Sequence, residues 1–288
     1  MWYPSCMSVP RPYLSQLVQR ALEEDLGRGD VTTEACVAEG SPGAATLRAR
    51  EACVFCGVAV VREVFAQLDP SVRVEEVVAD GMRVEPGAAL MHWAGPARSL
   101  LEAERVALNF AQRMSGIASL TRSYVDALPA TSRARITDTR KTTPGLRVLE
   151  RYAVRCGGGY NHREDLSAAV LIKDNHIAAA GGVGNAIERA RAHAAHTSRI
   201  ECEVDSLSQL ATALQHRADI VLLDNFSHAQ LGEAVAMVAG RAIIEVSGGV
   251  TLERVRSIAL AGADIISVGA LTHSARAVDL GLDWNEAT

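Results

Sequence analysis

Short apolar runs recur at a near-constant spacing in the second half of the chain. Six of them begin near residues 134, 169, 199, 219, 242 and 264, and the last four recur every 20 to 23 residues. Ala-, Leu- and Arg-rich stretches at helical spacing lie between them, as in 183–195 and 228–239. Wholly apolar strands that alternate with helices predict parallel strands buried on both faces. Because no GxGxxG opens the pattern, this spacing favours a closed or nearly closed β/α barrel over an open Rossmann sheet, and six strands admit an incomplete barrel.

The residues before Pro129 show a different pattern. Apolar side chains at helical spacing predict a helix over 12–26, which Gly27 and Gly29 end. Short alternating runs broken by Gly and Pro follow, and they predict a small sheet. The apolar segment 58–68 is expected to form a helix against that sheet.

A long helical pattern runs from 99 to 128, and the pair 115–116, Ser-Gly, predicts a bend or break within it. The pattern changes after this stretch. We therefore predict two domains, an N-terminal α/β domain over 1–128 and a β/α barrel over 129–275. The C-terminal tail, 276–288, can pack back on the first domain.

Charge and composition exclude several classes of protein. A hydrophobic content of 48% and a charged content of 22% are ordinary for a globular protein, and a net charge of −5 argues against a broad nucleic-acid surface. No apolar run reaches the roughly 18 to 20 residues of a membrane span. The N-terminus "MWYPSCMSVPRPYLSQL" lacks the basic start and apolar stretch of a secretory signal. We expect a cytoplasmic protein that binds neither nucleic acid nor membrane, so a local cluster of cations is expected to bind a small anion.

The six cysteines include one CxxC motif, Cys53 to Cys56 in "CVFC". Such a motif can carry redox chemistry or half of a zinc site. No second CxxC and no nearby pair of histidines accompanies it, and the surrounding stretch is apolar. We interpret these thiols as free, buried and packed as small hydrophobic side chains.

Lysine is almost absent from the chain. The 29 Lys and Arg residues include only two lysines, Lys141 and Lys173. Each follows an apolar run, in "ITDTRKTTPGLR" and "AVLIKDNH", where a predicted strand ends. Snorkelling at the surface is the alternative for both, but arginine fills every ordinary cationic position here. Because barrel active sites form at the carboxyl ends of strands, both lysines are predicted to serve one.

Polar side chains also stand at the other predicted strand ends, and only those that point inward can face one cavity. These residues are Asp174, Asn175, Glu203, Asp205, Asp224, Asn225, Glu245, Ser247 and Ser267. Asp205 is explained as well by a role as helix N-cap. After Asp224, Ser227 can cap the next helix, which leaves the Asp224 carboxylate for function.

Glycine turns add a signal for phosphate. "SGG" at 247–249 and "VGAL" at 268–271 follow the last two predicted strands, where many barrels bind phosphate on backbone N–H groups. Three further glycines, 157–159, precede His162 and Arg163. They suit either a flexible loop or a close approach of the backbone to a ligand.

The predicted rim therefore combines cations with carboxylates. The cations are Arg140, Lys141, His162, Arg163 and Lys173, and the carboxylates are Glu203 and Asp224. An arginine fork matches a carboxylate bidentately. The arrangement predicts a site for a polyanion together with a group that needs carboxylates, such as Mg²⁺ or sugar hydroxyls.

Several long segments are typical of one enzyme family. They include "EEDLGRGDVTT", "EAERVALNFAQRMSGIAS", "DTRKTTPGLR", "RYAVRCGGGYNHR", "LIKDNHI", "EVSGGV" and "ISVGALTHS". Over essentially the whole chain they resemble the quinolinate phosphoribosyltransferases. One departure is visible, because Glu164-Asp165 stands where the family usually has Leu-Gly. These carboxylates could weaken substrate affinity or point to solvent.

The resemblance implies a fold and a reaction. The fold is an N-terminal α/β sandwich followed by an incomplete parallel β/α barrel of the type II phosphoribosyltransferases. The reaction joins quinolinate to 5-phosphoribosyl-1-pyrophosphate (PRPP) with Mg²⁺, and it yields nicotinate mononucleotide, pyrophosphate and CO₂ in NAD biosynthesis. Members act as homodimers, with possible higher oligomers, in which an arginine reaches the partner's site. The matching residue is Arg105, which would otherwise be explained as a helix-surface partner of Glu102.

The resemblance also implies the roles of individual residues. Lys141, Glu203 and Asp224 are expected to be catalytic, and the last two are expected to lie near Mg²⁺, directly or through water. The expected substrate-binding residues are Arg105, Thr139, Arg140, His162, Arg163, Lys173, Ser247, Gly248, Gly249, Gly269, Ala270 and Leu271.

Three alternative functions stay open. A related protein associated with molybdenum transport shares the fold. A Schiff-base aldolase could use Lys141 or Lys173 on a sugar phosphate, and borohydride trapping would detect its imine. A metabolite-binding protein that kept the fold would bind ligand without releasing pyrophosphate.

Overall fold

The computed structural model describes residues 9–285, which divide into two compact units. Unit 1 holds the residues up to Arg122, Thr143–Gly158 and the residues from Thr272 onward. Unit 2 holds Ser123–Thr142 and Gly159–Leu271. Each unit therefore assembles segments that are far apart in the sequence. The ranges predicted from the sequence place 143–158 with the barrel, and they allow the tail 276–288 to pack on the first domain.

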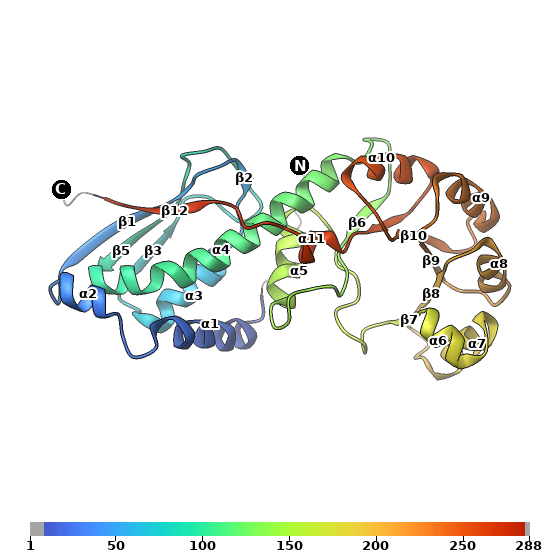
Figure 1. Ribbon diagram of the computed structural model, residues 1–288, viewed down its shortest axis with the longest axis horizontal. Coiled ribbons are helices and arrows are strands. Elements are labelled where there is room, and N and C mark those ends of the chain that lie inside the picture. The colour runs from blue at the N-terminus through green and yellow to red at the C-terminus, as the bar shows by residue number, and fades with distance from the viewer. Residues whose placement is uncertain (1–8, 286–288) are drawn as a thin grey trace. The chain divides into compact units, whose positions relative to one another are not determined.

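Unit 1 is built on an antiparallel sheet of four strands with the order β12-β1-β5-β3, which Figure 1 traces side by side. Its strands are β1 (Pro42–Ala49), β3 (Arg73–Glu76), β5 (Ala89–Pro96) and β12 (Leu280–Trp284), and a small pair is formed by β2 (Cys53–Val54) and β4 (Arg83–Val84). Its helices are α1 (Arg11–Leu26), α2 (Val31–Cys36), α3 (Val58–Leu68), α5 (Arg147–Cys156) and most of α4 (Ala97–Asp126). The helices predicted over 12–26 and 58–68 are confirmed.

Local sequence explains why two of these helices begin where they do. A proline occupies the first turn of α1, where its missing N–H costs nothing, and buried Leu14, Val18 and Leu22 recur every four residues along one face. That face packs against α3. The Asp30 carboxylate caps α2 by accepting the Thr32 and Thr33 N–H groups at 3.0 Å.

The core of unit 1 is made by apolar side chains of the sheet and of α3. Leu47, Leu90 and Trp93 are fully buried, and the Trp93 ring meets the Phe65 ring edge-on with centroids 4.9 Å apart. Burying one such side chain contributes about 1.5–3 kcal/mol to stability.

Helix α4 corrects one prediction, because it runs unbroken through Ser115 and Gly116 for 30 residues. Gly116 is explained by close packing of two backbone segments. A Cβ at this position would lie 1.9 Å from the carbonyl oxygen of Arg276, so only glycine lets the two backbones approach. Ser115 is fully buried, and its hydroxyl accepts from the Cys56 N–H at 2.9 Å.

The cysteines of the CxxC motif follow the prediction. Cys53 and Cys56 are buried and form no disulfide, and burial raises the pKa of Cys53 to about 11. Cys36 is free but exposed, and Cys6 lies outside the described residues. Within residues 9–285 no helix is both long enough and apolar enough to cross a bilayer.

Unit 2 is an incomplete parallel β/α barrel of six strands in the order β6-β11-β10-β9-β8-β7. The strands are β6 (Arg135–Thr137), β7 (Val170–Ile172), β8 (Ile200–Val204), β9 (Ile220–Asp224), β10 (Ile243–Ser247) and β11 (Ile265–Ser267). The helices are α6 (Asp174–Ala180), α7 (Val183–His193), α8 (Leu207–Gln215), α9 (His228–Val238) and α10 (Leu252–Ala261), and α11 (Ala270–His273) begins in this unit. Helices α7 to α10 lie along the outer side of the strands (Figure 1).

Among the described strands, β6 and β7 are the two ends of this sheet and do not pair with each other. Tyr160 forms an isolated parallel bridge with Thr137 beside β6. All six predicted strands are present, and the incomplete barrel is confirmed. The carboxyl ends of parallel strands meet at one edge, and the predicted site residues that belong to unit 2 lie there.

Candidate active site

A pocket of about 350 Å³ opens at the carboxyl ends of the barrel strands. Nine of the residues predicted to be catalytic or to bind substrate line it. They are Thr139, Arg140, Lys141, His162, Arg163, Lys173, Glu203, Asp224 and Ser247. Leu171, Leu222, Glu245 and Ser267 complete the lining. Unit 2 thus brings the predicted cations and carboxylates together in one pocket.

The segment that carries Arg140 and Lys141 is fastened where it leaves β6. Asp138 is fully buried, and its carboxylate accepts from the His162 N–H at 2.7 Å and from the Asn161 amide at 2.6 Å. One buried carboxylate therefore ties the residues after β6 to the residues that follow the three glycines. The Lys141 N–H donates to the Thr139 hydroxyl at 3.1 Å, which gives the turn its shape.

Arg140 and Arg163 form the cationic side of the pocket. The pKa of Arg163 is lowered, first by burial and then by the nearby positive charge of Arg140. Two guanidinium groups close enough to disturb each other favour a bound anion, since an anion relieves their repulsion. Arg163 is held in place by a hydrogen bond of 3.1 Å from its side chain to the Ala169 carbonyl.

His162 lies against two buried carboxylates. Its Nε2 is 3.4 Å from Glu201 Oε2 and 3.4 Å from Glu245 Oε1. Glu201 lies in β8 and Glu245 lies in β10. Burial opposes a charge on His162, but its contacts with Glu201 and Glu245 outweigh burial and raise its pKa to about 10. Burial raises the pKa of Glu201. The Arg163 N–H also donates to His162 Nδ1 at 2.7 Å, a bond that only the neutral ring can accept, so charging His162 requires this bond to open.

Lys173 and Glu203 form an ion pair across the pocket. Lys173 Nζ lies 2.8 Å from Glu203 Oε2, with 46% of the lysine side chain and 18% of the glutamate side chain exposed. Lys173 immediately follows β7, and its N–H donates to His176 Nδ1 at 2.9 Å. The pair is open to solvent on the lysine side, so the ammonium group can also reach an anion in the pocket.

Asp224 ends β9 beside the first glycine turn. Asn225, which follows it, has a φ of +58° and donates its amide to the Asp224 carboxylate at 2.8 Å. Gly248 has a φ of +78°, and a Cβ there would lie 2.3 Å from Asn225 Oδ1 and 2.7 Å from Asp224 Oδ1. Glycine is therefore required both by the backbone conformation and by the close packing of the acidic side chain.

Comparison with known proteins identifies the family of this chain. The model of the quinolinate phosphoribosyl transferase N-terminal domain matches residues 30–115, and that of the C-terminal domain matches residues 117–283. The chain belongs to the quinolinate phosphoribosyl transferase family. Both halves of the chain are matched, so the resemblance seen in the sequence is confirmed.

Individual relatives of this quinolinate phosphoribosyl transferase family member match over nearly their full length. The nicotinate-nucleotide pyrophosphorylase [carboxylating] of Mycobacterium leprae is 46% identical over 274 residues, which cover 92% of this chain and 95% of the relative. The probable enzyme of the same name from Bacillus subtilis is 40% identical, with 94% and 93% covered. The solved structure of the nicotinate-nucleotide pyrophosphorylase from Francisella tularensis has a TM-score of 0.92 and 39% identity, covering 96% of this chain and 98% of that one.

Six predicted residues of the family member do not line the pocket within the described part of the chain. Arg105 is exposed on α4 in unit 1. The others are Gly248 and Gly249 after β10, and Gly269, Ala270 and Leu271 after β11. Gly249 has a φ of +55°, so the turn after β10 needs glycine at two consecutive positions.

The two carboxylates that depart from the family pattern differ from the pocket residues. Asp165 accepts from the Ser167 N–H at 2.8 Å and from its hydroxyl at 2.7 Å, and these bonds lower its pKa. Glu164 and Asp165 are both exposed, and neither lines the pocket. The Asp165 carboxylate is thus used to shape its own loop.

Sequence reasoning missed Glu201 as a site residue, and it named Glu245 at a strand end without assigning it a role. The alternation within "RIECEVD" carried the missing signal, because Glu201 and Glu203 are two residues apart and share a face of β8. A glutamate deep in an apolar strand needs a partner, and His162 is the partner here.

Proposed function

We propose that the chain transfers the phosphoribosyl group of PRPP to quinolinate with loss of CO₂, giving nicotinate mononucleotide and pyrophosphate for NAD biosynthesis. Family membership supports the reaction. The observation that carries it is a single pocket in which two arginines, two lysines and a histidine face carboxylates at the strand ends. A dianionic pyridine and a polyphosphate both need such an excess of cations.

Quinolinate is assigned to the side of the pocket that holds the guanidinium groups. Its two carboxylates match the forked donors of Arg140 and Arg163, and His162 lines the same side of the pocket. Lys141 is placed beside them. Because these cations lie on strand ends and on segments fastened by Asp138, their geometry is set before the substrate arrives.

The phosphoribosyl donor is assigned to the side that holds Lys173, Glu203 and Asp224. Lys173 would contact the pyrophosphate, and the two carboxylates would accept from ribose hydroxyls. The 5-phosphate would take backbone N–H groups of two turns, Ser247–Gly249 and Gly269–Leu271, which follow the last two strands.

The residues of this site offer the ligands that suit a Mg²⁺ ion. It is usually held by one or two carboxylates together with substrate phosphates and water. Glu203 and Asp224 are two carboxylates of one pocket, and they would hold the ion directly or through water. When bound, it would neutralise charge on the leaving pyrophosphate.

The residues of the chain then account for the steps of the reaction. As the bond from C1 to pyrophosphate breaks, C1 gains positive charge, which Glu203 and Asp224 stabilise. The pyridine nitrogen bonds to C1 and becomes quaternary, so the ring can accept the electron pair that remains when the adjacent carboxylate leaves as CO₂. Lys141 steers that carboxylate and supplies the proton that the ring carbon takes up.

The proposal includes an assembly and a compartment. In a homodimer, or a higher oligomer built from it, Arg105 would reach the quinolinate site of the partner, and its exposure on α4 leaves it accessible for that role. A cytoplasmic location agrees with the cysteines Cys36, Cys53 and Cys202, which form no disulfide, as is typical of a reducing compartment.

The experiment that tests the proposal measures pyrophosphate release from PRPP and Mg²⁺, with quinolinate, nicotinate and nicotinamide in parallel. We expect turnover with quinolinate alone, accompanied by one CO₂ per pyrophosphate. Turnover with nicotinate or nicotinamide would contradict the assigned substrate. If no pyrophosphate is released with any of the three, the result would favour the function of the relative associated with molybdenum transport or that of a binding protein.

A further inference from the structure

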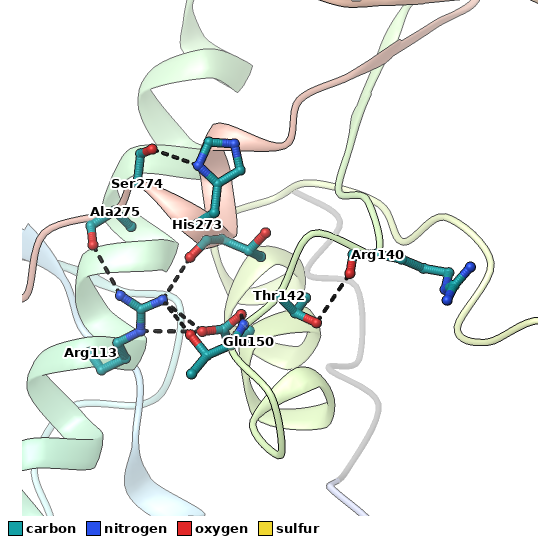
Figure 2. A network of polar contacts seen from close by, with 9 residues as sticks. Arg113, Arg140, Thr142, Glu150, His273, Ser274 and Ala275 are labelled. Carbon is teal, nitrogen blue, oxygen red and sulfur yellow. Dashed lines mark hydrogen bonds and ion pairs between the residues drawn. The ribbon is translucent and has the colours of Figure 1, made fainter. Parts of the chain in front are cut away.

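Arg113 of α4 is the centre of a polar network that lies within unit 1 (Figure 2). Its guanidinium donates to Glu150 Oε1 at 2.7 Å and to the Thr143 hydroxyl at 3.2 Å. It also donates to two backbone carbonyls, those of Thr272 at 2.7 Å and Ala275 at 3.2 Å. One side chain of α4 therefore binds two segments, 143–150 and 272–275, that are far apart in the sequence.

The Glu150 carboxylate makes the first of these connections rigid. Its side chain is only 1% exposed, and the Arg113 side chain is 28% exposed. Its second oxygen accepts from the Thr143 N–H at 3.1 Å, so both the backbone and the hydroxyl of Thr143 are held. A buried carboxylate with these partners has one stable orientation, because leaving it without the arginine would be strongly unfavourable.

The two carbonyls make the second connection. Thr272 belongs to the short helix α11, and Ala275 follows its end. Carbonyl groups at the end of a helix lack partners within the helix, and a cation is favourable there. Thr272 is fully buried, so the Arg113 guanidinium supplies a bond that water cannot supply.

The held residues are neighbours of residues that line or border the pocket. Thr143 lies two residues after Lys141, and the Thr142 hydroxyl donates to the Arg140 carbonyl at 3.4 Å (Figure 2). Thr272 directly follows the glycine turn 269–271. Both segments enter unit 1 at the residue that Arg113 binds, since unit 1 resumes at Thr143 and again at Thr272.

We propose that Arg113 is a positioning residue that fixes both substrate subsites at once, through Thr143 for quinolinate and through Thr272 for the 5-phosphate of the donor. The inference rests on the proposed function for the identity of the two ligands. Arg113 touches neither substrate and acts through the backbone that carries the binding groups. Glu150 shares only the first of the two connections, and this difference separates the two residues experimentally.

The kinetic test compares Arg113→Met, Glu150→Gln and a control, Arg62→Met. Arg62 forms an ion pair with Glu76 at 3.3 Å in the same unit, away from both segments. A displacement of about 1 Å at a site can cost roughly 100-fold, so we expect Arg113→Met to lower kcat/KM by roughly 10- to 100-fold for both substrates. Glu150→Gln should affect quinolinate and leave the KM for PRPP within about threefold of wild type, because the Thr272 and Ala275 bonds remain.

Arg113→Met leaves a buried carboxylate unpaired and can prevent folding. The double variant Arg113→Met/Glu150→Gln removes both charges and keeps an oxygen that accepts from the Thr143 N–H. Hydrogen exchange then reports the positions of the segments without activity. We expect faster exchange in 139–146 and in 269–275 for the double variant, and in neither segment for Arg62→Met.

Three results would overturn the inference. One is a lower melting temperature with unchanged kcat/KM for both substrates below the transition, which would mean a purely structural role. A second is a loss confined to one substrate in the Arg113 variant, and a third is unchanged exchange in either segment. If wild-type enzyme shows no turnover with quinolinate, the proposed function fails, and the exchange result still decides whether Arg113 positions the two segments.

Discussion

Replacing Lys173 with methionine should separate function from stability. The substitution keeps most of the aliphatic stem and removes the ammonium group that lies 2.8 Å from Glu203 Oε2. With 46% of the lysine side chain exposed, the ion pair is well solvated. Such pairs contribute about 0.2–1 kcal/mol to stability, so the variant should unfold within about 1 kcal/mol of wild type.

The functional cost is expected to be larger. In the proposed complex the same ammonium group contacts the pyrophosphate of the donor. A hydrogen bond to a charged group contributes about 1.5–3 kcal/mol, which corresponds to roughly 10- to 160-fold in kcat/KM for PRPP. Lys173→Arg should recover part of this loss, because it keeps the charge but changes the shape of the donor.

A matched control lies in the same unit. Arg191 pairs with Asp219 at 3.3 Å, and 45% of its side chain is exposed, almost the same fraction as for Lys173. Arg191→Met removes an ion pair of the same class and also a hydrogen bond to the Arg217 carbonyl, so it should lower stability by about 0.5–1.5 kcal/mol more than Lys173→Met and leave kcat/KM within about twofold. Urea unfolding and pyrophosphate release on all three proteins decide the matter. Equal kcat/KM for the Lys173 and Arg191 variants would refute the assignment of Lys173 to the donor.

Three further predictions follow from residues of both units. Lys141→Ala should lower kcat by about 100-fold or more at saturating substrates, and a change within threefold would exclude Lys141 as the proton donor. His162 has a pKa raised above its unfolded value to about 10, so its contribution to stability is fully present below about pH 6.5 and is lost as pH rises toward 10. Its Cε1–H resonance should show no titration between pH 5 and 8, and a midpoint near 6.5 would contradict the Glu201 and Glu245 contacts. Gly116→Ala, which in an exposed helix would add about 1 kcal/mol of stability, should instead lower the melting temperature through its contact with the Arg276 carbonyl.

The barrel could be predicted because each strand and helix pair repeats the same local pattern. Strongly apolar strands such as β9 can be identified from the sequence, and the polar residues that end β9 and β10, Asp224 and Ser247, mark the rim. The scarcity of lysine selected Lys141 and Lys173 without any knowledge of the fold. Both line the pocket.

Features that depend on long-range packing could not be predicted in the same way. Gly116 looks like a break in a helix, and only the backbone of Arg276, 160 residues later, explains it. The His162–Glu201–Glu245 cluster joins side chains that are brought together by the arrangement of the barrel strands and not by spacing along the chain. The placement of α5 in unit 1 is equally non-local, since Glu150 must find Arg113.

The pairing of β12 with β1 has a consequence for how the protein is made. Leu280–Trp284 supplies an outer strand of the unit 1 sheet, beside a strand that ends at Ala49. Ribosomes add about 5–20 residues per second, so β1 waits roughly 10–50 s for this partner, while every strand of the barrel has already been synthesised. The unit that contains the first helices is thus the last to be completed. A nascent chain stalled before Leu280 would have every barrel strand synthesised, but the unit 1 sheet would still have an open edge along β1.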